Sequence, residues 1–189
     1  MPEARMPFPG AFFIALMAPA LVLGAQSFLR EADAPRAIFG EAATATRKTL
    51  ELTDAELVSL GEKLGRKIAI RRYPYLEVNN ARGPAGLIFI FDVIGQSQPI
   101  TFAVGVTTDG ALQDVQVMMY REPQGEEIQE KRFRRQFSGK RLNDPIALGK
   151  DIDAISGATI SSRSASYAAR KALALFEAWR VRNDALVKP

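Results

Sequence analysis

Small and hydroxyl-bearing side chains are concentrated in one stretch of this sequence, DIDAISGATISSRSA, at positions 151–165. Four hydroxyls in it could donate hydrogen bonds to an anion, and they belong to Ser156, Thr159, Ser161 and Ser162. Gly157 and Ala158 would let such a ligand approach the backbone closely. The stretch predicts a phosphate-binding site, and a plain turn followed by a helix cap explains the same residues equally well.

A helix has to position these hydroxyls. After the stretch, apolar residues recur at steps of three and four, at Ala165, Ala169, Ala172, Phe176 and Trp179. We expect Ser161 and Ser162 to act as N-caps of this helix. The unpaired N–H groups of its first turn and the positive end of its dipole would then face the anion.

The composition excludes several kinds of chemistry. The 189 residues contain no Cys and no His, which rules out Ser-His-Asp triads, thiolate nucleophiles, iron–sulfur clusters and imidazole-bound metals. We expect no metal site and no catalytic residue of these classes, so any redox reaction needs a bound organic cofactor. The net charge of +4 is too small to indicate nucleic-acid binding, and no P-loop or dinucleotide fingerprint is present.

Two segments in the middle of the chain predict β-strands. Residues 87–95 (LIFIFDVIG) form an apolar run of β-favouring residues, and residues 100–120 divide at Asp109-Gly110, a strong hairpin signal. Residues 71–86, interrupted by two prolines and paired asparagines, are expected to form a loop or a frayed strand. These pieces predict a small, mostly antiparallel sheet.

Two further helices are expected beside this sheet. Thr53 and Glu56 have the spacing of a capping box ahead of a short amphipathic helix. Residues 126–137 have helical character, with Phe133 and Phe137 one turn apart. The fold class predicted from all these elements is α+β, a sheet with flanking helices.

The N-terminal part predicts export. An apolar run of 16 residues, 10–25, follows Arg5 and suits either a cleaved signal peptide or a retained membrane anchor. A buried core helix is the alternative, which prolines at positions 7, 9 and 19 disfavour. We therefore divide the chain into a signal or anchor segment (1–30), a helical or linker region (31–80) and a functional domain (81–189).

The segment Asp153-Ala154-Ile155-Ser156-Gly157-Ala158-Thr159 resembles the flavinylation signature Asp-x-x-Ser/Thr-Gly-Ala-Thr of the FMN-binding domain family. Weaker similarity, in the same order along the chain, extends over residues 86–175. The family includes flavin-carrying subunits of the sodium-translocating quinone reductase and of the Rnf-type electron-transfer complex, with short stand-alone members that this chain resembles most. Residues 81–189 are thus expected to be an FMN-binding domain.

The resemblance implies that FMN is bound covalently to Thr159 through a phosphoester. In the family, a flavin transferase moves the FMN half of FAD onto this threonine in a magnesium-dependent step. Asp153 would orient the loop or be recognised by the transferase, and Tyr120, Glu122 and Gly125 are expected to contact the flavin ring.

The predicted function is an exported electron-transfer flavoprotein, periplasmic or at the outer face of the cytoplasmic membrane. Its partners would be membrane or periplasmic redox proteins, and its N-terminal segment could attach it to the membrane. The basic residues Arg132, Arg134, Arg135 and Lys140 would favour reduced flavin or dock an acidic partner. The alternatives are a flavin-dependent reductase of a small substrate and a non-redox binding module at the membrane surface.

Overall fold

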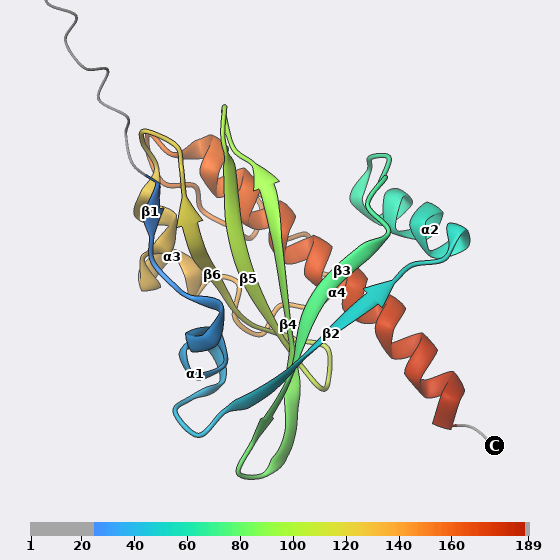
Figure 1. The fold of residues 1–189 in the computed structure, drawn as a ribbon. Coiled ribbons are helices and arrows are strands. Elements are labelled where there is room, and N and C mark those ends of the chain that lie inside the picture. The colour runs from blue at the N-terminus through green and yellow to red at the C-terminus, as the bar shows by residue number, and fades with distance from the viewer. Residues whose placement is uncertain (1–24, 188–189) are drawn as a thin grey trace, which may run out of the picture.

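The computed structural model describes residues 25–187. They form one antiparallel six-stranded sheet, in the order β1-β6-β5-β4-β3-β2, with flanking helices (Figure 1), which confirms the predicted α+β class. The elements are β1 (Gln26–Ser27), the 3-10 helix η1 (Glu31–Asp33), α1 (Ala34–Phe39), β2 (Thr44–Glu51), α2 (Asp54–Leu64), β3 (Arg72–Asn80), β4 (Gly83–Ile94), β5 (Pro99–Thr107), β6 (Leu112–Tyr120), the 3-10 helix η2 (Glu126–Gln129), α3 (Lys131–Arg134) and α4 (Thr159–Val187).

Most of the predicted signal or anchor segment lies outside the described residues. Its last part lies inside them, because Gln26 and Ser27 form β1 and pair with the end of β6. Between residues 25 and 187, no helix is long and apolar enough to cross a membrane.

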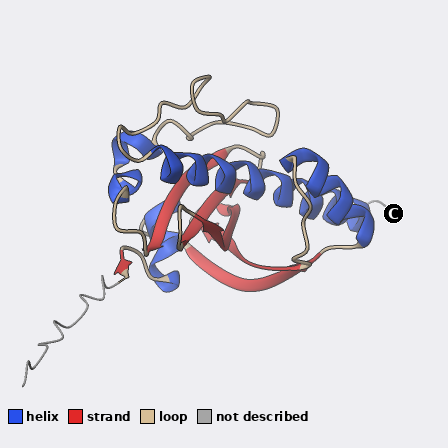
Figure 2. Cartoon of the chain, turned by 90° about the horizontal axis from the view of Figure 1, so that it is seen from above, coloured by secondary structure: helices blue, strands red, loops and turns tan. Residues whose placement is uncertain are grey.

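The long helix α4 crosses one face of the sheet and covers the main core (Figure 2). The side chains of its apolar stripe that face the sheet are small, and Ala165, Ala168, Ala169 and Ala172 are all buried. Small side chains let the helix axis approach β5, whose Phe102 and Val104 are fully buried beneath it. The alanine-rich pattern therefore produces a helix that packs tightly along the sheet.

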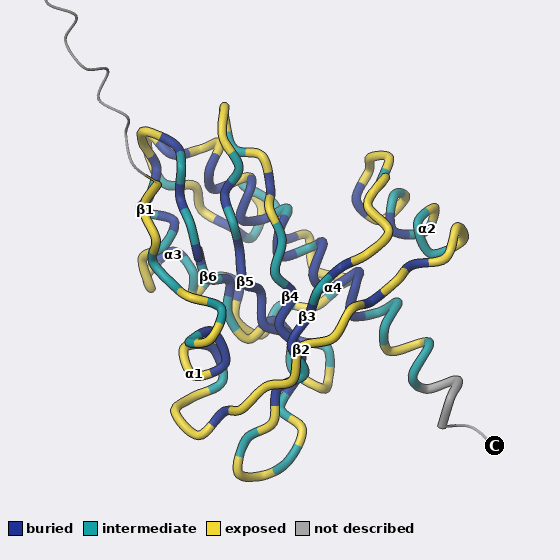
Figure 3. Tube along the Cα trace, in the orientation of Figure 1, coloured by how far each residue is buried: buried dark blue, intermediate teal, exposed yellow. Residues whose placement is uncertain are grey.

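The opposite face of the sheet is covered by the short helix α1. Ile38 of this helix packs in a second, smaller cluster with Ile88, Ala103 and Met118. The packing requires a glycine at position 105, because a Cβ there would lie 2.4 Å from the Ile38 Cγ2 atom. Figure 3 shows buried positions along the central strands and exposed positions at the loops.

Residues 71–86 were expected to be a loop or a frayed strand, and this prediction is wrong. Strand β3 pairs with β2 on one side and with β4 on the other, and β4 begins at Gly83. Pro74 is tolerated because the β3–β4 ladder starts one residue later, at Tyr75 opposite Phe89. Pairing on both sides outweighs the local turn signals, so β2 and β3 extend the same sheet as β4–β6.

The helical character expected over residues 126–137 is confirmed, but it is divided between η2 and α3. Glu130 has an extended conformation, with φ −63° and ψ 139°, and it separates η2 from α3. The break turns Phe133 and Phe137 into the core, where their rings meet edge to face at 5.4 Å. Burial of the two aromatic rings therefore determines the conformation of residues 126–137 more strongly than helical propensity does.

The other predicted elements are confirmed. Thr53 and Glu56 form the capping box of α2, with each side chain accepting a hydrogen bond from the backbone of the other. The Asp109-Gly110 turn joins β5 to β6, with Gly110 at φ +82°. The alanine-rich segment is helix α4.

Candidate functional site

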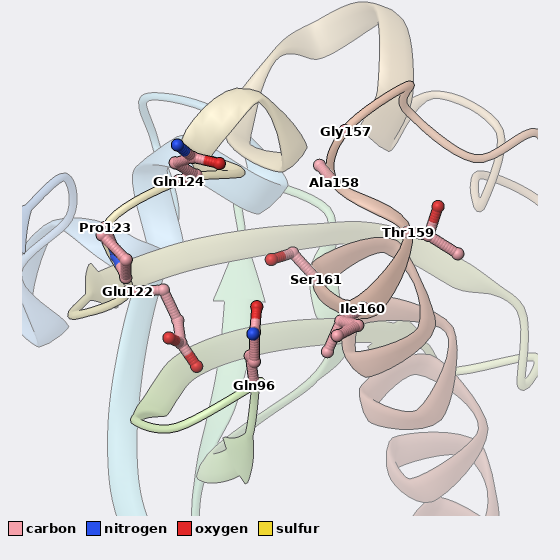
Figure 4. Close-up of a pocket in the computed structure, with 9 residues that line it drawn as sticks. All are labelled: Gln96, Glu122, Pro123, Gln124, Gly157, Ala158, Thr159, Ile160 and Ser161. Carbon is pink, nitrogen blue, oxygen red and sulfur yellow. The ribbon is translucent and has the colours of Figure 1, made fainter.

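A cavity of about 260 Å³ lies where α4 begins, at the edge of the sheet where β4 and β6 end (Figure 4). Its walls come from three segments that are distant in sequence: the β4–β5 turn, the chain after β6, and the loop leading into α4. The residues that line it are Gln96, Glu122, Pro123, Gln124, Gly157, Ala158, Thr159, Ile160 and Ser161.

The start of α4 forms one wall of the cavity. Thr159 is the first helical residue and its side chain is exposed, pointing away from Gln96 and Glu122 in Figure 4. Gly157 has a φ of +80°, which glycine adopts without strain, and a Cβ there would meet nothing within 4 Å. The first N–H groups of a helix have no intrahelical acceptors, so this wall attracts an anion.

Ser161 and Ser162 do not cap the helix, because α4 begins at Thr159 and both serines lie inside its first turn. The predicted N-cap role is therefore wrong. The buried Ser162 hydroxyl instead accepts a hydrogen bond from the Ile155 N–H at 3.2 Å, which folds the preceding loop back onto the helix. The Ser161 hydroxyl lies 2.7 Å from the Tyr120 hydroxyl.

Tyr120 and Gly125 lie behind the cavity wall. The Tyr120 hydroxyl donates to the Gln124 carbonyl, so the Ser161 hydroxyl must be the donor in the Ser161–Tyr120 hydrogen bond. Burial raises the pKa of Tyr120, although the hydrogen bond with Ser161 opposes this, and its ring belongs to the core. These contacts join the end of β6 to the start of α4.

Gly125 has to be glycine for two reasons. Its φ is +98°, and a Cβ would lie 2.7 Å from both the Ser161 Oγ atom and the Tyr120 hydroxyl. We expect Gly125→Ala to lower the free energy of unfolding by about 3 kcal/mol, measured by urea denaturation.

Gly139→Ala is the matched control for this change, because Gly139 has a φ of +80° and open space around its Cβ position. Gly139→Ala should lower the free energy of unfolding by only about 1 kcal/mol, because it introduces backbone strain without a close contact. Equal losses in the two variants would show that the close approach to Ser161 and Tyr120 has no energetic effect.

The Glu122 carboxylate holds the β4–β5 turn against the end of β6. It accepts hydrogen bonds from the Ser97 N–H at 2.6 Å, the Ser97 hydroxyl at 2.9 Å and the Gln98 N–H at 2.9 Å. Burial by itself would raise the pKa of Glu122, but the backbone hydrogen bonds from Gln98 and Ser97 outweigh it and lower this pKa. Glu122 thereby positions Gln96, whose side chain lines the cavity beside it.

Glu122→Gln should lower the free energy of unfolding by about 1–2 kcal/mol at pH 7, because an amide replaces a charged acceptor. The folded-state pKa of Glu122 is lowered, so its stabilisation is present above the unfolded glutamate pKa, about 4.3, and is lost as the pH falls through the folded value. Urea denaturation at pH 7 and pH 3 measures this, and the loss should shrink at pH 3. A loss that stays constant with pH, or one shared by the exposed Glu62→Gln, would contradict a role for the charge.

Asp153 and Ser156, two residues of the signature, do not line the cavity. Both are exposed, and the Asp153 backbone N–H donates to the Gln136 side chain at 2.7 Å. The loop before them is anchored by Asp151, which accepts hydrogen bonds from the Ala147 N–H at 2.9 Å and from Lys140 at 2.8 Å. Their exposure fits recognition by another protein better than contact with a ligand inside the cavity.

Most of the basic residues after β6 form ion pairs within the chain. Lys140 pairs with Asp151, Arg132 with Glu130, and the partly buried Arg134 with Asp114. Arg135 alone of the four is exposed with no ion pair to any residue between 25 and 187. The segment therefore offers much less free charge to a partner than the sequence suggests.

The sequence analysis missed four residues that line the cavity, namely Gln96, Pro123, Gln124 and Ile160. The order of the predicted strands could have placed Gln96 at the site. If residues 87–95 and 100–120 form an antiparallel meander, the turn that joins the first two strands must lie at the same sheet edge as residue 120. The other three residues are chain neighbours of predicted site residues.

The same segments are matched by a known family. The sequence model of the family described as FMN-binding domain covers residues 95–174, from the β4–β5 turn to the middle of α4. Residues 95–174 form an FMN-binding domain. This confirms the family that the Ser-Gly-Ala-Thr signature indicates, and the FMN-binding domain includes every residue that lines the cavity.

A solved structure has the same fold. The crystal structure of Shewanella oneidensis NqrC is similar to this chain, with a TM-score of 0.52. The two sequences are 18% identical, and the alignment covers 77% of this chain and 88% of that chain. No curated protein sequence matches this chain.

The cavity of the FMN-binding domain fits the phosphate end of FMN. Unpaired N–H groups at the start of α4, with the positive end of its dipole, suit a phosphate ester, and Gly157 leaves open space beside them. The only carboxylate in the lining is Glu122, which directs its oxygens at the β4–β5 turn. The donor set at this helix end is therefore compatible with a negatively charged group.

Proposed function

We propose that this protein is an exported electron carrier that holds FMN through a phosphoester to Thr159. The observation that carries the proposal is the position of Thr159, which is exposed at the first residue of α4 and borders the cavity of the FMN-binding domain. An acceptor hydroxyl that another enzyme modifies has to be accessible in this way.

Attachment would be carried out by a flavin transferase that uses FAD and magnesium. The Thr159 oxygen forms a bond to the FMN phosphorus, the pyrophosphate bond of FAD breaks, AMP leaves, and the hydroxyl proton passes to solvent. The resulting phosphodiester keeps one negative charge, which the α4 N-terminus stabilises by about 0.3–1 kcal/mol when exposed. The transferase would recognise the exposed Asp153 and Ser156.

Bound flavin supplies a group that accepts two electrons and passes them on singly. The chain itself favours a carrier over a reductase, because the one titratable side chain in the cavity lining, Glu122, is engaged by the β4–β5 turn. A reductase acting on a substrate needs a proton donor within reach of it. The FMN-binding domain places no free donor of that kind in the cavity.

We place the carrier in the periplasm or at the outer face of the cytoplasmic membrane, where the apolar run at residues 10–25 directs it. Covalent attachment suits that location, because a dissociating cofactor would be diluted outside the cell. Its partners are membrane or periplasmic redox proteins.

The test is the intact mass of the full chain produced with and without a flavin transferase, together with its visible spectrum. A gain of one FMN minus one water, with a yellow chromophore that is reduced and reoxidised reversibly, is the expected result. Steady-state turnover of a small substrate by the flavinylated chain would favour the reductase. Absence of the mass gain in the presence of active transferase would favour a non-redox module.

A further inference from the structure

The N-terminal segment joins the domain at the cavity. Gln26 pairs with Tyr120 and Ser27 with Met119, and the two strands are antiparallel. Gln26 therefore lies beside the last residue of β6, two residues before Glu122 of the cavity lining. Figure 1 shows β1 at the end of the molecule where β6 finishes and α4 starts.

No linker separates the apolar run from the folded domain. The run ends at Ala25, and the next residue, Gln26, is already part of the sheet. One extended residue spans at most about 3.5 Å, so a segment held in a bilayer would keep this end of the domain at the bilayer surface. A flexible connection, by contrast, would let the domain turn freely.

Apolar and basic side chains are exposed at this same end. Ile94 is 67% exposed and Ile160 is 41% exposed, and the Ser164 hydroxyl joins their elements by donating to the Ile94 carbonyl at 3.0 Å. Arg163, one turn after Ile160, is exposed and forms no ion pair with any residue in the described part of the chain. We define Ile94, Ile160 and Arg163 as the membrane-facing edge.

We propose that the membrane-facing edge rests on an anionic lipid bilayer, so that the cavity and Thr159 lie at the lipid surface. This inference rests on the proposed export and on retention of the N-terminal segment as an anchor. The isoleucines would enter the headgroup region, and Arg163 would pair with lipid phosphates. The flavin would then exchange electrons with a partner embedded in, or dissolved in, the same membrane.

Because the chain has no native Cys, a single introduced thiol can be labelled uniquely. Ile94→Cys reports on the membrane-facing edge. Val181→Cys is the matched control, since Val181 is 59% exposed and lies about 30 Å further along α4 from Ile160. The full-length chains, produced without transferase and labelled with bimane, are inserted into phosphatidylcholine–phosphatidylglycerol vesicles that carry brominated acyl chains.

We expect the label at Ile94 to be quenched about threefold more than the label at Val181. Adding Arg163→Glu to the Ile94→Cys chain should reduce that quenching, whereas Arg82→Glu, in the turn at the far end of β4, should leave it unchanged.

Three results would overturn the inference. If the chain does not float with the vesicles, the N-terminal segment is not a retained anchor, and the mass gain at Thr159 is unaffected by that outcome. Equal quenching at Ile94 and Val181 in floated chains excludes the lipid surface and leaves the edge to a protein partner. Disulfide-linked dimers of unlabelled Ile94→Cys would assign the edge to a second copy of the chain.

Discussion

Thr159→Ala is expected to abolish flavin attachment completely. The full chain should gain the mass of FMN minus water when it is produced with a flavin transferase, and the alanine variant should gain nothing. The physical reason is that alanine leaves no oxygen at the first residue of α4 to form the phosphoester. Intact-mass spectrometry and in-gel flavin fluorescence both measure the outcome.

Two control variants separate chemistry from folding. Thr159→Ser keeps a hydroxyl at the same position and should retain the mass gain. Ser138→Ala removes an exposed hydroxyl that lies outside the signature and does not line the cavity, and it too should retain attachment. Thr159 is exposed, so none of these changes should lower the free energy of unfolding by more than about 0.5 kcal/mol. Flavin attached to the Thr159→Ala chain would show that a different hydroxyl is the acceptor.

Lys171→Met is expected to stabilise the protein by about 1–3 kcal/mol at pH 7. Lys171 lies on the sheet-facing side of α4 and is only 5% exposed. Its ammonium group lies 4.8 Å from the centre of the Tyr73 ring and 4.2 Å from that of Phe91. Burial lowers the pKa of Lys171 to about 8, with a further lowering by Arg66 and an opposing effect of Asp92.

The lowered pKa determines how stability depends on pH. The unfolded chain binds more protons at this position than the folded chain between pH 8 and the ordinary lysine value of 10.5. The free energy of unfolding should therefore rise as the pH increases through that window, and the unfavourable contribution, at most about 3 kcal/mol, is fully present below it.

Urea denaturation at pH 7 and pH 10 measures both effects. Lys171→Met should be more stable than the native chain at pH 7, and the difference should become smaller at pH 10. The exposed Lys63→Met on α2 is the control and should change stability by less than about 0.5 kcal/mol at either pH. A loss of stability in Lys171→Met would show that the cation–π contacts with Tyr73 and Phe91 outweigh the cost of burying the charge.

Local signals in the sequence were sufficient where an element depends on its own residues. The periodic alanines specify α4, the Thr53–Glu56 spacing specifies the start of α2, and Asp109-Gly110 specifies the β5–β6 turn. In each case the decisive interaction joins residues only a few positions apart. Strand β3 was expected only as a loop or a frayed strand, because its stability comes from pairing with β2 and β4, which compensates for Pro74.

The candidate site shows the same difference between features set by neighbouring residues and features set by distant ones. Glu122 was expected to contact the flavin ring; it lines the cavity, and its carboxylate binds the N–H groups of Ser97 and Gln98, which are 25 and 24 positions away. Ser161 and Ser162 were expected to cap α4, whereas they bind Tyr120 and Ile155 from within its first turn. The partners of Glu122 and Ser161 lie 24 to 41 positions away and become neighbours only when the strands have assembled, so no local pattern contains them.

The sequence by itself determined the chemistry that is open to this protein. The Ser-Gly-Ala-Thr signature indicated an FMN-binding domain, and the absence of Cys and His excluded thiols, iron–sulfur clusters and imidazole-bound metals. The tertiary structure alone decided which residues share one cavity, and that the N-terminal segment joins the domain beside it. The physical reason is that antiparallel pairing places the ends of β4 and β6, and the start of the helix packed across them, at one edge of the sheet.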